Sequence, residues 1–175
     1  QLENGACDPE WFHRFWSQLD PKQWKLLDKN AKFACSGTGH SRALTFARAL
    51  SGEFKVDELA PLVLSKRNPN QVRALGLIPL GDDPEQDIKH RYAVLQEFLA
   101  GSRQFGSMKQ TTEKLAFEIA IENLAFTAGY PDALRLIWAM EAAEVQDLKG
   151  DGASVTVDEL TVRLYFDILG QPTVE

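Results

Sequence analysis

The fold is decided by residues 83–104, DPEQDIKHRYAVLQEFLAGSRQ. This stretch starts with Asp83, which suits the N-cap of a helix, and Pro84, whose missing N–H costs nothing at the first helical position. Apolar side chains then recur at helical spacing, at Ile88, Tyr92, Leu95, Phe98 and Leu99. The pattern predicts a long amphipathic helix from Glu85 to about Gln104, which Gly106 ends.

Comparable signals occur on both sides of this helix. Asp8-Pro9 and Asp20-Pro21 repeat the Asp-Pro start, and Gly129 fits the position just past a helix end. We therefore expect further helices over residues 9 to about 19, 21 to about 35, 40–50, 56–67 with a kink at Pro61, 71–77, 107–127 and 131 to about 148.

Each of these helices has an apolar face that we expect to be buried. The expectation covers, among others, Trp11, Phe15, Trp24, Leu27, Leu62, Leu115, Leu134 and Trp138. Consecutive helices of similar length joined by short breakers are typical of stacked antiparallel helices. No repeated consensus is present, so an irregular HEAT-like or armadillo-like solenoid and an irregular bundle both stay open.

The sequence period changes after the last helix. Lys149-Gly-Asp-Gly152 is a turn signal, and residues 154–157, 160–166 and 172–174 are rich in β-branched and aromatic side chains. This predicts a short C-terminal antiparallel β-meander on an otherwise mainly α protein. We expect a helical domain over residues 1–149 and the meander over residues 150–175.

The meander is expected to begin a further module of a longer protein. The chain starts at Gln1 and stops inside a strand-like segment, residues 171–175. A piece of a larger chain shows such ends.

Composition places the chain among ordinary globular domains. It has 175 residues, with 19 Lys and Arg against 25 Asp and Glu, a formal net charge of −6. Residues 1–140 hold 17 basic and 17 acidic side chains, whereas residues 141–175 hold eight acids and two bases. The charge argues against a strongly basic nucleic-acid domain, and the frequent apolar residues argue against disorder.

The cysteine content and the hydrophobicity of the sequence indicate a cellular compartment. Cys7 and Cys35 are too few for a disulfide framework, and free thiols fit a reducing cytosol. No run of about 18 apolar residues is present, so we expect no membrane span. A cytoplasmic protein without a membrane partner is the expectation.

Several short motifs stand out between residues 74 and 164. They are ALGLIPL (74–80), RYAVLQEF (91–98), SRQFGS (102–107), ENLA (122–125), AGYPDALRLIWAME (128–141), VTV (155–157) and LTVRL (160–164). Together they resemble the central region of the MolR-like (molybdate-regulator-like) family of large bacterial proteins, a domain-of-unknown-function family. The resemblance covers about residues 70–170. It implies a helical-repeat part of a long cytoplasmic protein, sometimes accompanied by a WGR domain, and it brings no catalytic residues.

A stripe of lysines is the clearest candidate binding surface. Lys22, Lys25, Lys29 and Lys32 are spaced three, four and three residues apart, which places them on one side of a helix. Such a stripe can hold phosphate backbones or an acidic partner, including the acidic C-terminal segment. A solvated helix face is the alternative.

A second set of polar residues is expected between the long helices. The set consists of Arg91, Arg103, Glu118, Asn123, Arg135 and Glu141. Buried Arg–Glu pairs and Asn side chains can tie helices together, and a polar pocket made by the same residues is the functional alternative.

Other motifs support no metal, cofactor or catalytic site. The segment from Asp147 to Asp158 has some residues of a calcium loop, but Lys149 takes a ligand position and the final Glu is missing. The glycine-rich residues 37–41 match no phosphate-binding spacing, so a helix-connecting turn is the simpler interpretation. The scattered His13, His40 and His90 form no metal motif.

Three functional hypotheses follow. The first is a non-catalytic scaffold module of a larger bacterial protein, which contacts other domains of that chain or another protein. The second is nucleic-acid association through the lysine stripe. The third is an enzyme with a site between helices near Arg91, Arg135 and Glu141, for which the sequence offers no catalytic constellation.

Overall fold

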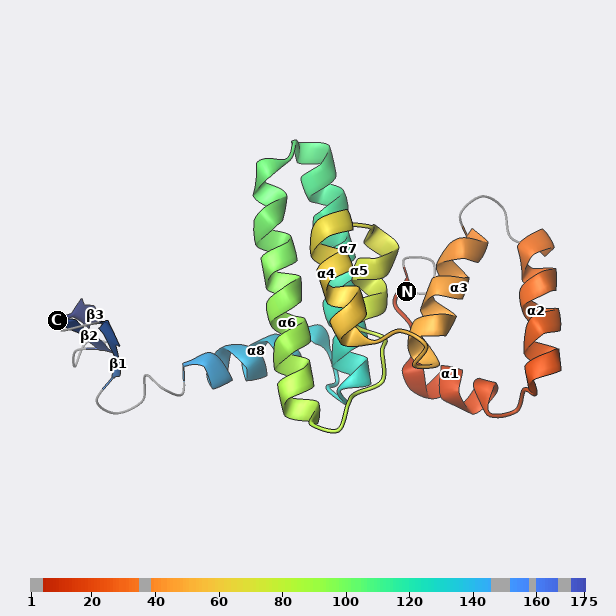
Figure 1. The fold of residues 1–175 in the computed structure, drawn as a ribbon, viewed down its shortest axis with the longest axis horizontal. Helices are drawn as coiled ribbons and strands as arrows, with labels where there is room; N and C mark the ends of the chain where they lie inside the picture. The colour runs from red at the N-terminus through yellow and green to blue at the C-terminus, as the bar shows by residue number, and fades with distance from the viewer. Residues whose placement is uncertain (1–4, 35–38, 146–151, 158–159, 167–170) are drawn as a thin grey trace. The chain divides into compact units, whose positions relative to one another are not determined.

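The computed structural model describes residues 5–34, 39–145, 152–157, 160–166 and 171–175 (Figure 1). It divides into two compact units, Gln1–Leu136 and Ile137–Glu175. The predicted class, mainly helical with a short C-terminal antiparallel sheet, is confirmed. The predicted domain boundary between residues 149 and 150 lies outside the described residues.

The elements follow the predicted order. The helices are α1 (Pro9–Trp16), α2 (Pro21–Ala34), α3 (Gly39–Leu50), α4 (Val56–Lys66), α5 (Pro69–Leu75), α6 (Pro84–Gly101), the 3-10 helix η2 (Ser102–Gln104), α7 (Ser107–Thr127) and α8 (Ala133–Glu144). Among the described helices, none has both the length and the apolar character needed to cross a bilayer.

Side-chain caps start the helices where the Asp-Pro signals predicted them. Asp83 Oδ1 accepts a hydrogen bond from the Gln86 N–H at 3.1 Å. Asp8 caps α1 and Asp20 caps α2 in the same way. These caps satisfy N–H groups that have no partner within the helix.

Several boundaries differ from the prediction, including the end of α1 and both ends of α8, and two of the differences have a clear local cause. Helix α5 begins at Pro69 and not at Gln71, because Asn68 caps it by accepting from the Asn70 N–H at 2.9 Å. Helix α4 ends at Lys66, since Arg67 adopts a left-handed conformation with φ 53°. The sequence Asn-Pro-Asn is thus a helix start and not only a turn.

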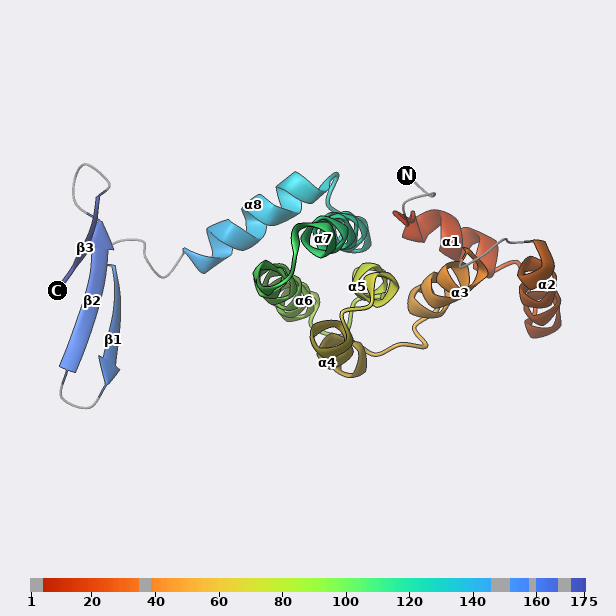
Figure 2. The same ribbon diagram turned by 90° about the horizontal axis from the view of Figure 1, so that it is seen from above.

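Helices α4 to α7 form a four-helix bundle within the first unit. Figure 2 looks nearly along their axes and shows α5 and α6 each beside both α4 and α7, in agreement with their contacts. The fully buried core side chains include Leu75, Leu95, Phe98 and Leu124. Burial of these apolar groups is the main term that stabilises the bundle.

The contact between α5 and α7 is close because Gly76 has no side chain. A Cβ built on Gly76 would collide with the carbonyl oxygen of Ala120 and lie 2.8 Å from the Leu124 nitrogen. The Thr127 hydroxyl donates to the Gly76 carbonyl at 2.8 Å across the same contact.

The buried amide of Asn123 joins three segments of this unit. Its Nδ2 donates to the carbonyls of Gly5 and Arg73, both at 3.1 Å, and its Oδ1 accepts from the Cys7 N–H at 2.9 Å. Asn123 itself has no exposed surface. One side chain of α7 thereby holds the N-terminal segment and α5 in place.

Helices α1 to α3 follow each other beside the bundle, which they reach through the contact of α3 with α5. Aromatic rings join the first two helices, with the Trp16 and Trp24 centroids 4.6 Å apart. Phe12 on α1 and Phe46 on α3 are buried.

Several residues expected to be buried are exposed instead. They are Trp11, Phe15, Leu27, Leu62, Leu115, Leu134 and Trp138. The expected burial is wrong for these residues because each apolar stripe is wider than the area that its described neighbours cover.

The second unit contains the meander, with strands β1 (Ala153–Val157), β2 (Leu160–Phe166) and β3 (Pro172–Val174) in the order β1-β2-β3. Both pairings are antiparallel, with Val155 opposite Val162 and Leu164 opposite Val174. Leu160, Val162 and Val174 are exposed although the alternating pattern predicts one apolar face.

The contact at Gly76 gives the first testable prediction. Gly76→Ala should lower the free energy of unfolding by about 2–3 kcal/mol, because the added methyl group forces α5 and α7 apart. Chemical denaturation measures this loss. Gly106→Ala, at the N-cap of α7, is the control, since nothing lies within 4 Å of its built Cβ. It should cost no more than about 1 kcal/mol, which is the preference of an N-cap for Gly over Ala. Equal stability of the two variants would contradict the close contact.

Candidate functional site

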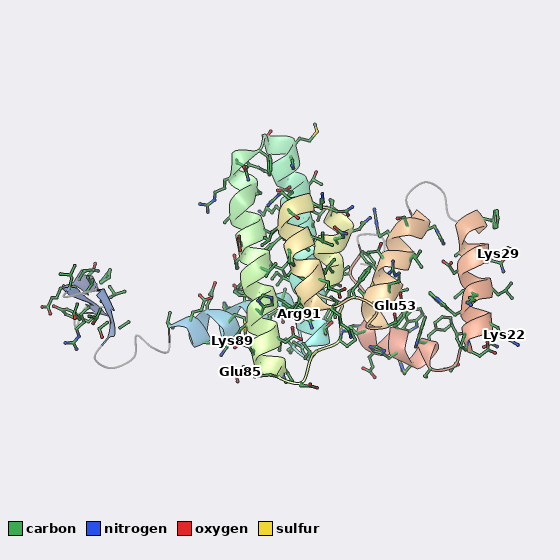
Figure 3. The ribbon with its side chains drawn as sticks, in the orientation of Figure 1. Lys22, Lys29, Glu53, Glu85, Lys89 and Arg91 are labelled. Carbon is green, nitrogen blue, oxygen red and sulfur yellow. The ribbon has the colours of Figure 1, made fainter. Side chains whose placement is uncertain are left out.

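The predicted lysine stripe lies on the outer side of α2. Lys22, Lys25 and Lys29 are exposed, and Lys22 and Lys29 project from the side of α2 away from α3 (Figure 3). Lys32 belongs to α2 by its backbone, but its side chain lies outside the described part of the structure. The three described lysines thus share one accessible face.

The acidic residue nearest to the lysines does not interrupt this face. Asp28 lies on the inner side of α2, together with the half-buried Trp24 and Ala31. Its Oδ1 is 3.0 Å from Nε2 of His40 on α3. Asp28 therefore helps to fix α2 against α3.

Two large apolar side chains lie among the lysines. Leu26 is 61% exposed and Phe33 is 79% exposed. The outer face of α2 consequently combines positive charge with apolar surface, a feature that the sequence analysis missed. The spacing of Leu26, Lys29 and Phe33 could have revealed it, because residues three and four apart share a helix face.

A groove of about 590 Å³ lies elsewhere in the first unit, between the start of α4, the loop before α6 and the first turns of α6. Its lining includes the apolar Phe54, Val56, Ile78 and Leu80 and the polar Lys55 and His90. Arg91 and Asp87 also contribute to the lining.

Arg91 is held in place by five oxygen contacts. Its guanidinium donates to both carboxylate oxygens of Asp87, at 2.7 and 2.5 Å, and to the carbonyls of Leu75, Ile78 and Pro79. The side chain has no exposed surface. Arg91 therefore fastens the loop after α5 to α6 and has no face turned to solvent.

The same contacts change the pKa of the Asp87 carboxyl. Burial alone raises its pKa, but hydrogen bonds from Arg91 and the Gly81 N–H, together with the Arg91 charge, outweigh burial. The pKa of Asp87 consequently lies below its ordinary value of 3.8. Asp87 is an ionised partner of Arg91 at neutral pH and not a proton donor.

A second buried ion pair joins α4 to α7. The Arg67 guanidinium donates to both carboxylate oxygens of Glu113 at 2.9 and 2.7 Å, and to the Phe98 carbonyl at 2.6 Å. Glu113 is only 2% exposed. Buried Arg–Glu pairing is thus present, but Arg67 was not predicted as its cation. Nothing in the local sequence marks Arg67, because its role depends on the left-handed turn after α4.

The other predicted polar residues do not gather in one cluster. Arg103 is exposed on η2, and exposed Glu118 is 3.8 Å from Lys114. Arg135 is exposed and paired with Asp132, three residues before it on the chain. Glu141 is an exposed residue of the second unit. Only Arg91 and Asn123 are buried, and they serve two separate junctions.

The described side chains offer little for catalysis. No three His, Cys, Asp or Glu side chains come close enough to hold a metal ion in the described part of the chain. Burial raises the pKa of the Cys7 thiol to about 11, so the nucleophilic thiolate is scarce at neutral pH. The residues of the calcium-like loop from Asp147 to Asp151, and Gly37 of the glycine-rich turn, lie outside the described residues.

Comparison with known proteins gives one finding. The model of a family of unknown function, DUF5724, matches residues 1–140. No curated protein and no solved structure was found to be similar. The matched segment contains the lysine face, the groove and both buried ion pairs.

The Arg91–Asp87 pair gives a second prediction. Asp87→Asn should lower the free energy of unfolding at neutral pH by about 3 kcal/mol, because it leaves a buried guanidinium without its counter-charge. The exposed neighbour Asp82 supplies the control, and Asp82→Asn should change stability by less than about 0.5 kcal/mol.

The pH dependence of this difference has a definite sign. Because the pKa of Asp87 is depressed on folding, its contribution is fully present above the ordinary value of 3.8. It is lost as the pH falls from there through the folded pKa. Urea denaturation across this range should show wild type and Asp87→Asn converging in stability at acid pH. A constant difference down to the lowest pH would contradict the assignment.

Proposed function

We propose that this chain, which belongs to the DUF5724 family of unknown function, is a non-catalytic helical module that contacts other protein segments through its surface. The observation that carries the proposal is a difference between the interior and the surface: charged side chains in the interior have structural partners, and large apolar side chains lie on the surface. The Arg91–Asp87 and Arg67–Glu113 ion pairs connect segments of the helical unit, whereas large apolar side chains are exposed.

The interior supports this proposal. Arg91, Arg67 and Asn123 bind to backbone and carboxylate groups of neighbouring segments, so each has a structural task. The enzyme hypothesis required Arg91 to act on a substrate, and its lack of any exposed surface counts against that role. The groove beside Arg91 is lined without a nucleophile and base at hydrogen-bond distance.

The surface supports it as well. On α1, the rings of Trp11 and Phe15 stack with centroids 5.7 Å apart, and Trp11 is 54% exposed. Exposed aromatic side chains of this kind are typical anchors of protein–protein contacts.

The setting of the module is part of the proposal. The motifs between residues 74 and 164 resemble MolR-like proteins, which supports a place within a large cytoplasmic bacterial protein. The partner would then be another domain of that protein or a separate protein.

Nucleic acid is the less favoured partner. Lys22, Lys25 and Lys29 give the required charge, but Leu26 and Phe33 occupy the same face and make no use of phosphate groups.

Photo-crosslinking tests the proposed function. A benzoylphenylalanine in place of Trp11, in the full chain expressed in its native cells, should give discrete protein adducts, because its ring would be covered by a partner. The control position is Met108, an exposed apolar residue with 85% of its surface accessible. Equal labelling at both positions, or no protein adduct from position 11, would contradict the proposal.

A further inference from the structure

We infer that the outer face of α2 binds an acidic amphipathic helix. This inference rests on the proposed function and specifies one surface and one partner class for it.

Lys22, Leu26, Lys29 and Phe33 are separated by four, three and four residues. This spacing is that of a seam along which two helices pack side by side. All four side chains are exposed, while the opposite side of α2 carries the half-buried residues that meet α1 and α3. The outer seam is therefore open along the described length of the helix.

The apolar members of the seam require cover from a partner. Leu26 and Phe33 lie seven residues apart, which corresponds to about 10 Å along a helix axis. They are 61% and 79% exposed, and Phe33 presents nearly its whole ring to solvent. A partner helix with apolar side chains at the matching heptad positions would remove both from water.

The lysines of the seam favour a partner with negative charge. Lys22 and Lys29 alternate with the apolar pair, and Lys25 flanks the seam on one side. Asp28 does not neutralise them, because it is held by His40 on the inner side of α2. Carboxylates at the seam and flanking positions of the partner would pair with these ammonium groups.

The same charges disfavour the alternative occupants. A second copy of α2 would place lysines opposite lysines in a parallel pair, and against Leu26 and Phe33 in an antiparallel pair. Neither arrangement supplies a counter-charge for the lysines. A phosphate backbone would leave Leu26 and Phe33 uncovered. A bilayer surface favours an apolar face separated from the cationic one, whereas here the two kinds of residue are interleaved.

The contact is small, since α2 has 14 residues. Such a contact buries less than the roughly 800 Å² per partner of a standard interface, so we expect a weak, reversible complex.

The test measures fluorescence anisotropy of a labelled helical peptide added to the full chain. The probe is an amphipathic peptide of about 21 residues, with Leu at the seam positions that face Leu26 and Phe33 and Glu at the other seam positions and at the flanking positions. A matched peptide with Lys in place of Glu, a single-stranded oligonucleotide and anionic vesicles serve as competing classes of ligand. The Glu peptide should bind, and the Lys peptide should not.

Variants on α2 localise the binding. Lys25→Glu combined with Lys29→Glu should weaken binding of the Glu peptide by at least about tenfold at about 50 mM NaCl. Phe33→Ser should weaken it by a similar factor, at least about tenfold, at both low and high salt, because the lost contact is apolar. All of these positions are on the surface, so the thermal midpoint should stay unchanged.

Matched controls are available on other helices. Lys66→Glu combined with Lys114→Glu makes the same change in charge, and Met108→Ser removes an apolar side chain that is 85% exposed. Both controls should keep the affinity within about twofold of wild type.

Several outcomes would overturn the inference. One is a Glu peptide that does not bind, and another is equal affinity for the Glu and Lys peptides. Binding of the Glu peptide that is unchanged by Phe33→Ser would also overturn it. So would an oligonucleotide or vesicles that bind more tightly than the Glu peptide and are weakened by the same α2 variants. If position 11 still crosslinks to protein in such a case, the α2 surface is wrong while the proposed function stands. If position 11 also gives no protein crosslink, both the α2 surface and the proposed function are wrong.

Discussion

A guanidinium that has no contact with water must find an oxygen for its N–H groups, and the helical unit is organised around this constraint. Arg91 satisfies it with Asp87, the carbonyl at the end of α5 and two carbonyls of the segment between α5 and α6. A long connection is thereby fastened to α6 at one end of the bundle. Arg67 and Glu113 do the same for α4 and α7. The cost of leaving any of these charges unpaired makes the arrangement specific.

The charged groups inside the protein have structural roles, so they are not available to bind a ligand. The groups that are chemically most distinctive, the two arginines and their carboxylates, are engaged in holding helices together. What remains accessible is a surface on which aromatic and aliphatic side chains lie beside lysines, above all on α2. Under the proposed function, the shape and charge of this exterior would determine what the module binds.

The sequence was a good guide to the elements and a poorer guide to their contacts. Asp8, Asp20 and Asp83 marked helix starts because capping is a local interaction between residues two or three apart. Strands β2 and β3 were placed correctly because their β-branched and aromatic residues are a local signal. In contrast, the Arg67–Glu113 pair links residues 46 apart, and the need for Gly76 arises only where α5 meets α7. The apolar stripes of α1 and α8 gave no sign of which parts stay uncovered, because exposure depends on the neighbouring elements.

The central claim is that binding takes place on the outer face of α2 and not in the groove beside Arg91. Backbone amide chemical-shift mapping of the full chain, titrated with the acidic helical peptide, tests this most directly. The account predicts shifts concentrated in residues 21–34, with the groove segments 52–57 and 78–91 unchanged. Shifts centred on those groove segments, with α2 unaffected, would contradict it.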